Sequence, residues 1–181
     1  MKKICLLSGL LFWVVKIGFS QTFQWVKTIG SVNGDLITGI AASNDGFVYV
    51  TGNFQDTIDL DNGPGVYPLI SSTFSYYEGQ FDTISGDRQL FLAKYTSDGQ
   101  IVWGKQFGGY YQDFAGIIKL DNTGDIILTG SYYFSIDLNY SDTLNAFGIS
   151  NAQNSFIAKF SPDGELIWDR RYESGAYLPE Y

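Results

Sequence analysis

The chain of 181 residues contains no histidine and a single cysteine, Cys5. Without histidine it lacks the commonest general base and metal ligand, and every Ser-His or Cys-His nucleophile system is excluded. Cys5 lies within the first 20 residues, which have the composition of a leader. Once that leader is removed, the chain has no disulfide, Cys metal site or Cys nucleophile.

Positive charge is also scarce, with 11 Lys and Arg against 19 Asp and Glu and a net charge of −8. Three of the basic residues, Lys2, Lys3 and Lys16, fall in the leader, so the remainder carries 8 basic and 19 acidic residues, or −11. Nucleic acid and anionic membrane surfaces would be repelled by this charge, and no basic patch offsets it. The sequence therefore argues against both as partners.

Proline occurs only four times, and no long stretch has helical spacing, whereas aromatic residues make up 17% of the chain. Tyr (13) and Phe (14) suit the pleated, half-buried surface of a sheet, and 21 glycines supply turns. This composition predicts an all-β protein.

Residues 1–20 are predicted to be a secretory signal peptide. Lys2 and Lys3 form a positive start, a mostly apolar run follows, and Gly18 and Ser20 are small residues before a cut at Gln21. The apolar run is shorter than the ~20 residues that a membrane helix needs. The expectation is a protein secreted to the cell-envelope surface or beyond, without an integral membrane span; an uncleaved anchor is the alternative.

The remainder of the chain repeats itself. Residues 25–60 match residues 103–138 without a gap at an offset of 78, and residues 91–103 return as 156–168 at an offset of 65. The difference places 13 extra residues in the first unit, within the loop 62–90, which reads as an extended loop or an added hairpin. Repetition at a fixed period is typical of solenoids, propellers and arrays.

Each unit is predicted to contain two hairpins. Asn-Asp-Gly, Asn-Thr-Gly, Ser-Asp-Gly and Pro-Asp-Gly turns lie at 44–46, 122–124, 97–99 and 162–164, between apolar runs. For the second unit the expected strands are 103–108, 115–121, 125–131 and 155–160. These strands are apolar on both faces, which favours four-stranded antiparallel sheets stacked as β-propeller blades; a β-sandwich or an open β-stack are the alternatives.

The predicted organisation is a first propeller repeat over 21–102, a second over 103–167 and the start of a truncated third over 168–181. Known propellers close with roughly 4–8 blades. About two blades plus the start of a third indicate an incomplete propeller: a fragment of a longer chain, a truncated reading frame, or a homo-oligomer that supplies further blades.

These motifs resemble a known repeat. Trp-x-Lys-x-Φ-Gly, a strand ending in Thr-Gly, Ile-Asp-Leu, and Phe-Φ-Ala-Lys-Φ-x-x-Asp-Gly-x-Φ-Φ-Trp, where Φ is an apolar residue, are similar to the SBBP (seven-bladed beta-propeller) repeat of secreted bacterial proteins. The resemblance covers nearly all of 25–172. It implies an exported seven-bladed propeller, often part of a longer surface protein, and no single activity.

Several residues that recur once per repeat are candidates for chemistry. Asp59 and Asp61 resemble half of a calcium loop, but the third acidic position is missing, so a structural turn is the favoured interpretation and structural calcium the weak alternative. The recurring acids Asp35, Asp113, Asp59 and Asp137 are expected to accept backbone N–H groups. Trp25, Trp103 and Trp168 are expected to pack between blades. Lys94 and Lys159 either pair with a recurring Asp or lie along the rim.

The segments that do not repeat are the predicted ligand-binding loops, because binding residues commonly lie on loops that a rigid scaffold holds in place. Their candidate residues are Tyr67, Phe74, Tyr76, Tyr77, Phe81, Tyr140 and Phe147. The alternative is a solvated loop with its rings tucked against the blade.

The sequence favours a secreted, non-enzymatic β-propeller scaffold or binding module for protein or glycan, without a cofactor. A carbohydrate-active hydrolase that uses carboxylates is the alternative, and a non-functional gene remnant is a third possibility. No catalytic residue is assigned.

Overall fold

The structure is a computed structural model that describes residues 23–61, 63–77, 80–85, 88–109, 112–133, 135–139 and 152–172, with the backbone alone for 72–77 and 80–85. The predicted signal peptide, 1–20, lies outside these residues. The described part of the chain is all-β, with antiparallel sheets and no helix. It is consistent with β-propeller-like blades, as the sequence predicts.

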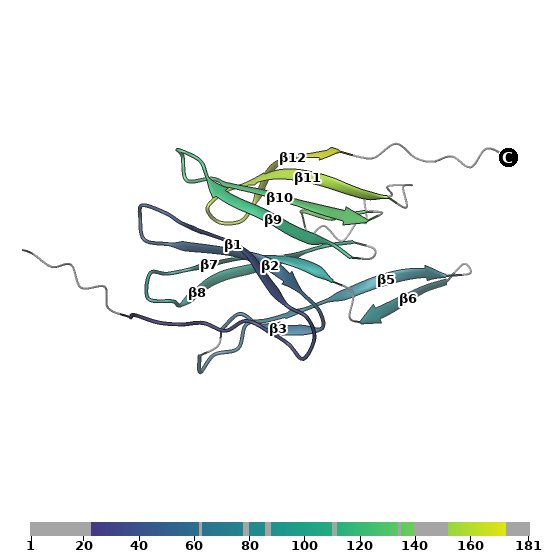
Figure 1. Cartoon of the computed structure of the whole chain (residues 1–181), viewed down its shortest axis with the longest axis horizontal. Helices are drawn as coiled ribbons and strands as arrows, with labels where there is room; N and C mark the ends of the chain where they lie inside the picture. Colours follow the sequence, from purple (N-terminus) through teal and green to yellow (C-terminus); the bar gives the residue numbers. More distant parts are fainter. Residues whose placement is uncertain are drawn as a thin grey trace, which may run out of the picture.

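Two four-stranded sheets form the body of the protein (Figure 1). The first sheet is β1 (Leu36–Ala42), β2 (Val48–Phe54), β7 (Gln89–Tyr95) and β8 (Ile101–Phe107), paired in that order. The second sheet is β9 (Phe114–Leu120), β10 (Ile126–Tyr133), β11 (Gln153–Phe160) and β12 (Leu166–Tyr172), paired likewise. The offsets of 78 and 65 residues superimpose the strands of one sheet on those of the other.

The four predicted hairpin turns are confirmed. Each joins neighbouring strands, and each ends on a glycine with φ between 80° and 91°, a backbone conformation that other L-residues adopt only at a cost. The glycines are Gly46, Gly99, Gly124 and Gly164.

The predicted phase of the repeat is wrong. The strand that carries Trp103 closes the first sheet rather than opening the second, and the strand that carries Trp168 closes the second sheet. Residues 168–172 are therefore not the start of a third sheet, and residues 23–35, which contain Trp25, form no strand. The reason is that β8 bonds to β7 through a full ladder, from Leu90–Phe107 to Tyr95–Ile101.

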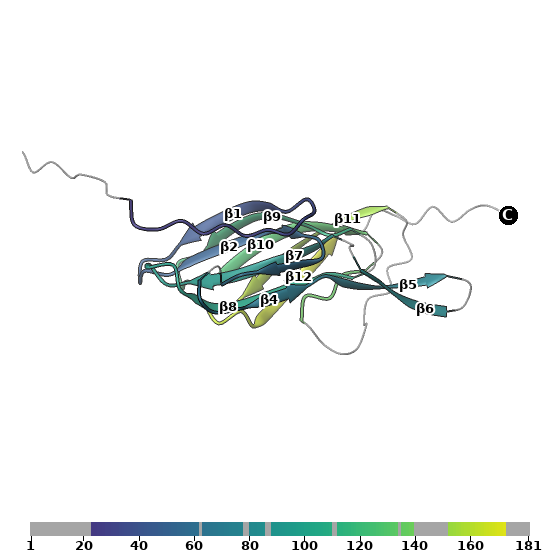
Figure 2. The same ribbon diagram turned by 90° about the horizontal axis from the view of Figure 1, so that it is seen from below.

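The inserted segment of the first unit contributes strands to two hairpins, in line with one of the two predicted outcomes. The first pairs β4 (Pro68–Ile70), from the inserted segment, with β3 (Thr57–Asp59), from the repeated stretch, and lies against the first sheet. The second, β5 (Ser72–Tyr77) with β6 (Gln80–Ser85), pairs only with itself and projects away from the stacked sheets (Figures 1 and 2).

The two sheets pack face to face around a shared core. Tyr49, Leu92 and Phe107 of the first sheet meet residues of the second sheet, and the rings of Phe107 and Phe160 lie 5.1 Å apart between centroids. The far face of the first sheet carries a second core, which the β3–β4 hairpin covers with Ile58 and Leu69. Burial on both faces, which the apolar strands predict, is confirmed for the first sheet.

Gly52 and Gly130 lie inside equivalent strands at a close approach of the backbone. A side chain at Gly52 would collide with the carbonyl oxygen of Leu36, and one at Gly130 with that of Phe114. The pairing register shifts beside both, which confirms the predicted bulge or close approach.

Candidate functional site

One backbone carbonyl joins the two sheets. The carbonyl oxygen of Pro162, in the β11–β12 turn, accepts from Lys94 Nζ at 3.1 Å, Trp103 Nε1 at 3.3 Å and Tyr49 Oη at 3.4 Å. Tyr49, Lys94 and Trp103 form one row across the first sheet, because Lys94 pairs with both neighbours. The row and the turn together make a socket, which we call the Pro162 socket.

Lys94 is the charged member of this socket, and its exposed fraction is only 6%. Its ammonium group lies 4.1 Å from the centre of the Phe47 ring and 3.9 Å from Asp163 Oδ1. Burial raises the pKa of Tyr49, and Asp45 and Asp163 raise it further, so its hydroxyl stays a donor. The socket is thus a closed structural contact, which confirms for Trp103 that the recurring tryptophan packs between blades.

Trp25 makes the equivalent contact one repeat earlier. Its Nε1 donates to the carbonyl of Ser97 at 2.8 Å, and its ring covers Gly99, as the Trp103 ring covers Gly164. Ile29 packs on the core of the first sheet, as the equivalent Phe107 packs on the core between the sheets. Residues 25–30 therefore contact the first sheet in the same way that β8, the edge strand of the first sheet, contacts the second sheet.

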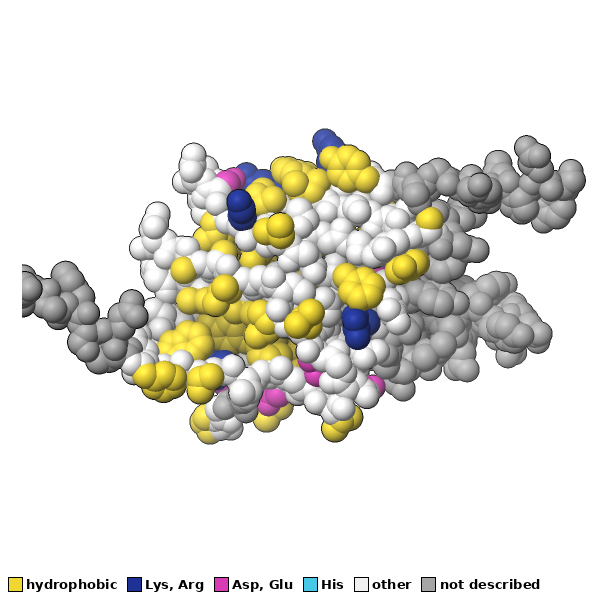
Figure 3. Space-filling view, in the orientation of Figure 1, with side chains coloured by type: hydrophobic (Ala, Val, Ile, Leu, Met, Phe, Trp, Pro, Cys, Tyr) yellow, Lys and Arg dark blue, Asp and Glu magenta, His cyan; other side chains and the backbone are white. Residues whose placement is uncertain are grey.

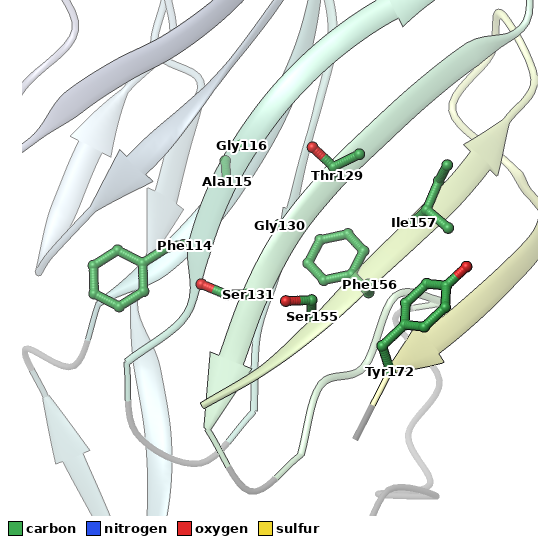
Figure 4. A pocket seen from close by; sticks show the side chains of 10 residues that line it. All are labelled: Phe114, Ala115, Gly116, Thr129, Gly130, Ser131, Ser155, Phe156, Ile157 and Tyr172. Atoms are coloured by element: carbon green, nitrogen blue, oxygen red, sulfur yellow. The ribbon is translucent and has the colours of Figure 1, made fainter. Parts of the chain in front are cut away.

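The outer face of the second sheet is open. It holds a shallow groove of about 470 Å³ that runs across β9, β10 and β11 to Tyr172 of β12 (Figure 4). The equivalent positions in the first sheet are covered by the second sheet: Phe107 is 3% exposed, whereas its counterpart Tyr172 is 63% exposed. This face is therefore open in the second repeat and covered in the first.

Lys159, the repeat partner of Lys94, has different contacts. Its ammonium group pairs with Asp121 and Asp125 of the β9–β10 turn, both at 2.8 Å. The hydrogen bond from Lys159, supported by Thr123, lowers the pKa of Asp121, and the two carboxylates raise the pKa of Lys159. Lys159 thus pairs with acids of its own sheet, whereas Lys94 reaches the neighbouring sheet. Asp121 and Asp125 are not among the recurring acids, because Ser43 and Phe47 stand at the equivalent positions of the first repeat.

The recurring acids have the structural role that the sequence predicts. Asp35 accepts from the backbone N–H groups of Ser31 and, at 3.0 Å, Gln55, and its counterpart Asp113 accepts from Gly109 at 2.8 Å. Asp137 accepts from the backbone of Asn139 at 2.9 Å. These carboxylates accept backbone N–H groups and thereby stabilise loops.

Asp59 and Asp61, the candidate calcium ligands, have partners from the chain. Asp59 Oδ1 accepts from the N–H groups of Asp61 at 2.9 Å and Tyr67 at 2.7 Å. Asp61 pairs with Lys27 at 3.2 Å and accepts from Gly63. Within the described residues, no group of three or more acidic side chains is placed to hold a metal ion. The calcium prediction gains no further ligand from the structure and stays a prediction.

Tyr67, alone among the predicted ligand-binding residues, has a described side chain. It lines a groove of about 580 Å³ between β4 and β8, and its hydroxyl bonds to both the oxygen (3.2 Å) and the nitrogen (3.1 Å) of Gly104. The backbone positions of Phe74, Tyr76, Tyr77 and Phe81 come together in the β5–β6 hairpin, where Tyr76 pairs with Phe81. Tyr140 and Phe147 lie outside the described residues.

No sequence pattern pointed to Gln106, which also lines this groove. Its side-chain amide accepts from the backbone nitrogen of Ile70 (3.2 Å) and donates to the backbone oxygen of Ile70 (3.0 Å). The Gln106 side chain thus bonds to the backbone of β4 in the way that a neighbouring strand would. Together with Tyr67 it attaches the β3–β4 hairpin to the outer edge of the first sheet. The groove is therefore a fixed surface.

No known protein-family profile matches the chain. The chain is 23% identical over 162 residues to an uncharacterized WD repeat-containing protein of Acanthamoeba polyphaga mimivirus, a match that covers 84% of this chain and 12% of that protein. This similarity agrees with propeller-like sheets and a scaffold or binding role. Among the described residues, no helix has the length and apolar character needed to cross a membrane.

Proposed function

We propose that the chain is a non-enzymatic, propeller-type binding module that recognises a glycan through the groove between β4 and β8 and the adjoining β5–β6 hairpin. The observation that carries this is the use of the recurring acids: their oxygens accept backbone N–H groups, while the inserted hairpins add a surface to the edge of the first sheet. A hydrolase would need a pair of carboxylates flanking the substrate.

The groove has the residue types that bind sugars. A tyrosine ring fixed by two hydrogen bonds and the Gln106 amide line it beside Pro68 and Ile70. Aromatic rings stack on the apolar face of a sugar, and amides bond to its hydroxyls. Ile70 is 57% exposed, so a ligand can reach the groove.

The location and the number of blades belong to the same proposal. The composition of residues 1–20 supports export, and the SBBP resemblance supports a place on the cell envelope or outside the cell. The two four-stranded sheets of the described residues are fewer than a propeller needs to close, which supports further blades from a longer chain or from other copies.

A glycan array tests the proposal with the wild type and three variants. In one variant a short Gly-Ser linker replaces residues 72–85; since β5 and β6 pair only with each other, its melting temperature should stay within about 2 °C of the wild type. Ile70→Ser changes the groove, and Ile117→Ser, at 64% exposure on the second sheet, is the matched control.

Wild type and Ile117→Ser are expected to bind the same glycans, whereas the other two variants lose at least about tenfold in affinity, or 1.4 kcal/mol. Equal binding by all forms would contradict the proposed site, and the absence of any bound glycan would contradict the ligand class. Hydrolysis of a glycan, abolished by one Asp or Glu substitution, would overturn the non-enzymatic role.

A further inference from the structure

The outer face of the second sheet carries a row of residues equivalent to the row in the Pro162 socket, but no turn from a neighbouring sheet lies against it. Ile127, Lys159 and Trp168 form one row by strand pairing, equivalent to Tyr49, Lys94 and Trp103. Trp168 is 36% exposed at the edge of this face, and Ile117 and Tyr172 are more exposed still. Figure 3 shows hydrophobic side chains along the upper edge of the molecule, where Figure 1 places β12.

The equivalent face of the first sheet is covered within the same chain. Two groups of the second sheet cover it: β9, with Ile118 buried against Gly39, and the turn that carries Pro162. In the first sheet, the counterparts of these covering groups are β1, with Ile40 exposed, and the turn that carries Ser97. A second copy of the chain therefore presents the surface that matches the open face.

The ion pair of the existing junction has no like-charged counterpart between copies. Across the existing junction Lys105 pairs with Glu165 at 2.8 Å. At the equivalent positions of a junction between copies, Arg170 would face the neutral Gln100.

One group already occupies the Ser97 carbonyl, and it belongs to the same chain. Trp25 donates to that oxygen at 2.8 Å, as Trp103 does to the Pro162 oxygen. Trp168 holds the third position of the tryptophan repeat, so Trp25 and Trp168 compete for one acceptor. Residues 25–30 form no strand, and a ladder therefore does not hold them to a sheet.

We propose that the outer face of the second sheet binds the first sheet of a second copy, with Trp168 displacing that copy's Trp25 from the Ser97 carbonyl. The contact joins two different surfaces, so association is head-to-tail and produces closed rings or open chains rather than a two-fold dimer. The segment around Trp25 acts as a built-in competitor that limits this association.

Sedimentation velocity over a range of concentrations tests the proposal with single substitutions. Trp168→Ala is expected to weaken self-association at least about tenfold, because it removes the aromatic anchor of the contact. Trp25→Ala is expected to strengthen self-association by a similar factor, because it removes the competitor. Ile167→Ala, at a neighbouring half-exposed residue whose counterpart Val102 stays 45% exposed beside the existing junction, is the control and should leave association unchanged.

Opposite changes in self-association affinity for Trp168→Ala and Trp25→Ala distinguish this mechanism from non-specific hydrophobic association, which both substitutions would weaken. Shifts in the same direction would overturn the proposal. It would also be overturned if the wild type and Trp25→Ala both stayed monomeric at high concentration, about 100 times that at which interfaces of standard size and μM affinity assemble. Should Trp25→Ala unfold, oxidative footprinting of the wild type decides instead: Tyr172 must become protected as concentration rises, and unchanged reactivity overturns the proposal. Glycan binding is measured independently, so the proposed function can stand or fall without this one.

Discussion

Gly130→Ala is expected to destabilise the protein by about 3 kcal/mol or more, a large part of the 5–15 kcal/mol that a typical domain has. An added methyl group would meet the carbonyl oxygen of Phe114 and the ring of Phe156 at distances that real side chains do not show. The carbonyl belongs to the strand pair β9–β10, so relief requires the strands to separate. Gly52, with the same contacts to Leu36 and Phe91, should behave alike.

Gly124→Ala is the matched control for this prediction. Gly124 has φ +86°, but a methyl group there would meet nothing within 4 Å, so its cost is limited to about 1–2 kcal/mol of backbone strain. Denaturant unfolding of both variants measures the difference. Equal losses of stability at the two positions would show that the backbones do not approach closely at Gly130.

Phe107→Ala is the second substitution with a large expected effect, about 3–5 kcal/mol. Phe107 is buried in the core between the sheets, where its ring lies against Phe160. Truncation leaves a cavity that the two stacked sheets cannot close without moving together.

Tyr172→Ala tests the same repeat position where no sheet covers it. Because Tyr172 is exposed on the outer face of the second sheet, its loss should cost within about 0.5 kcal/mol at concentrations where the chain is monomeric. Urea titrations of the two variants give the comparison. A large loss for Tyr172→Ala, or a small one for Phe107→Ala, would contradict the arrangement of the sheets.

The strands and turns could be predicted because their signals are local. Asp-Gly and Thr-Gly turns between apolar runs specify hairpins whatever the rest of the chain does, and all four are found. The bulge at Gly52 and Gly130 was predictable for the same reason, since a glycine inside a strand usually marks a close approach.

The grouping of strands into sheets could not be predicted in this way. A gapless repeat fixes the period but not the residue at which a unit begins, and only hydrogen bonding assigns the Trp103 strand to the sheet before it. The fates of Lys94 and Lys159 also depended on tertiary contacts. Their strand sequences are nearly identical, but one lies under the neighbouring sheet and the other beside Asp121 and Asp125.

For the candidate site the sequence indicated the inserted segment, because it breaks the repeat, and within it Tyr67. It could not indicate Gln106 or the Pro162 carbonyl. Gln106 lies in a repeated strand, where a polar residue carries no special signal, and a backbone oxygen has no signature in a sequence at all.

Oxidative footprinting of the folded chain at low concentration tests most directly the central claim, that two repeat-related sheets stack with one face covered and the equivalent face open. Reactivity at each ring is compared with that of the same residue in denaturant. We expect strong protection of Phe107 and little protection of Tyr172, in line with exposed fractions of 3% and 63%. Equal protection of the two residues would contradict the stacked arrangement.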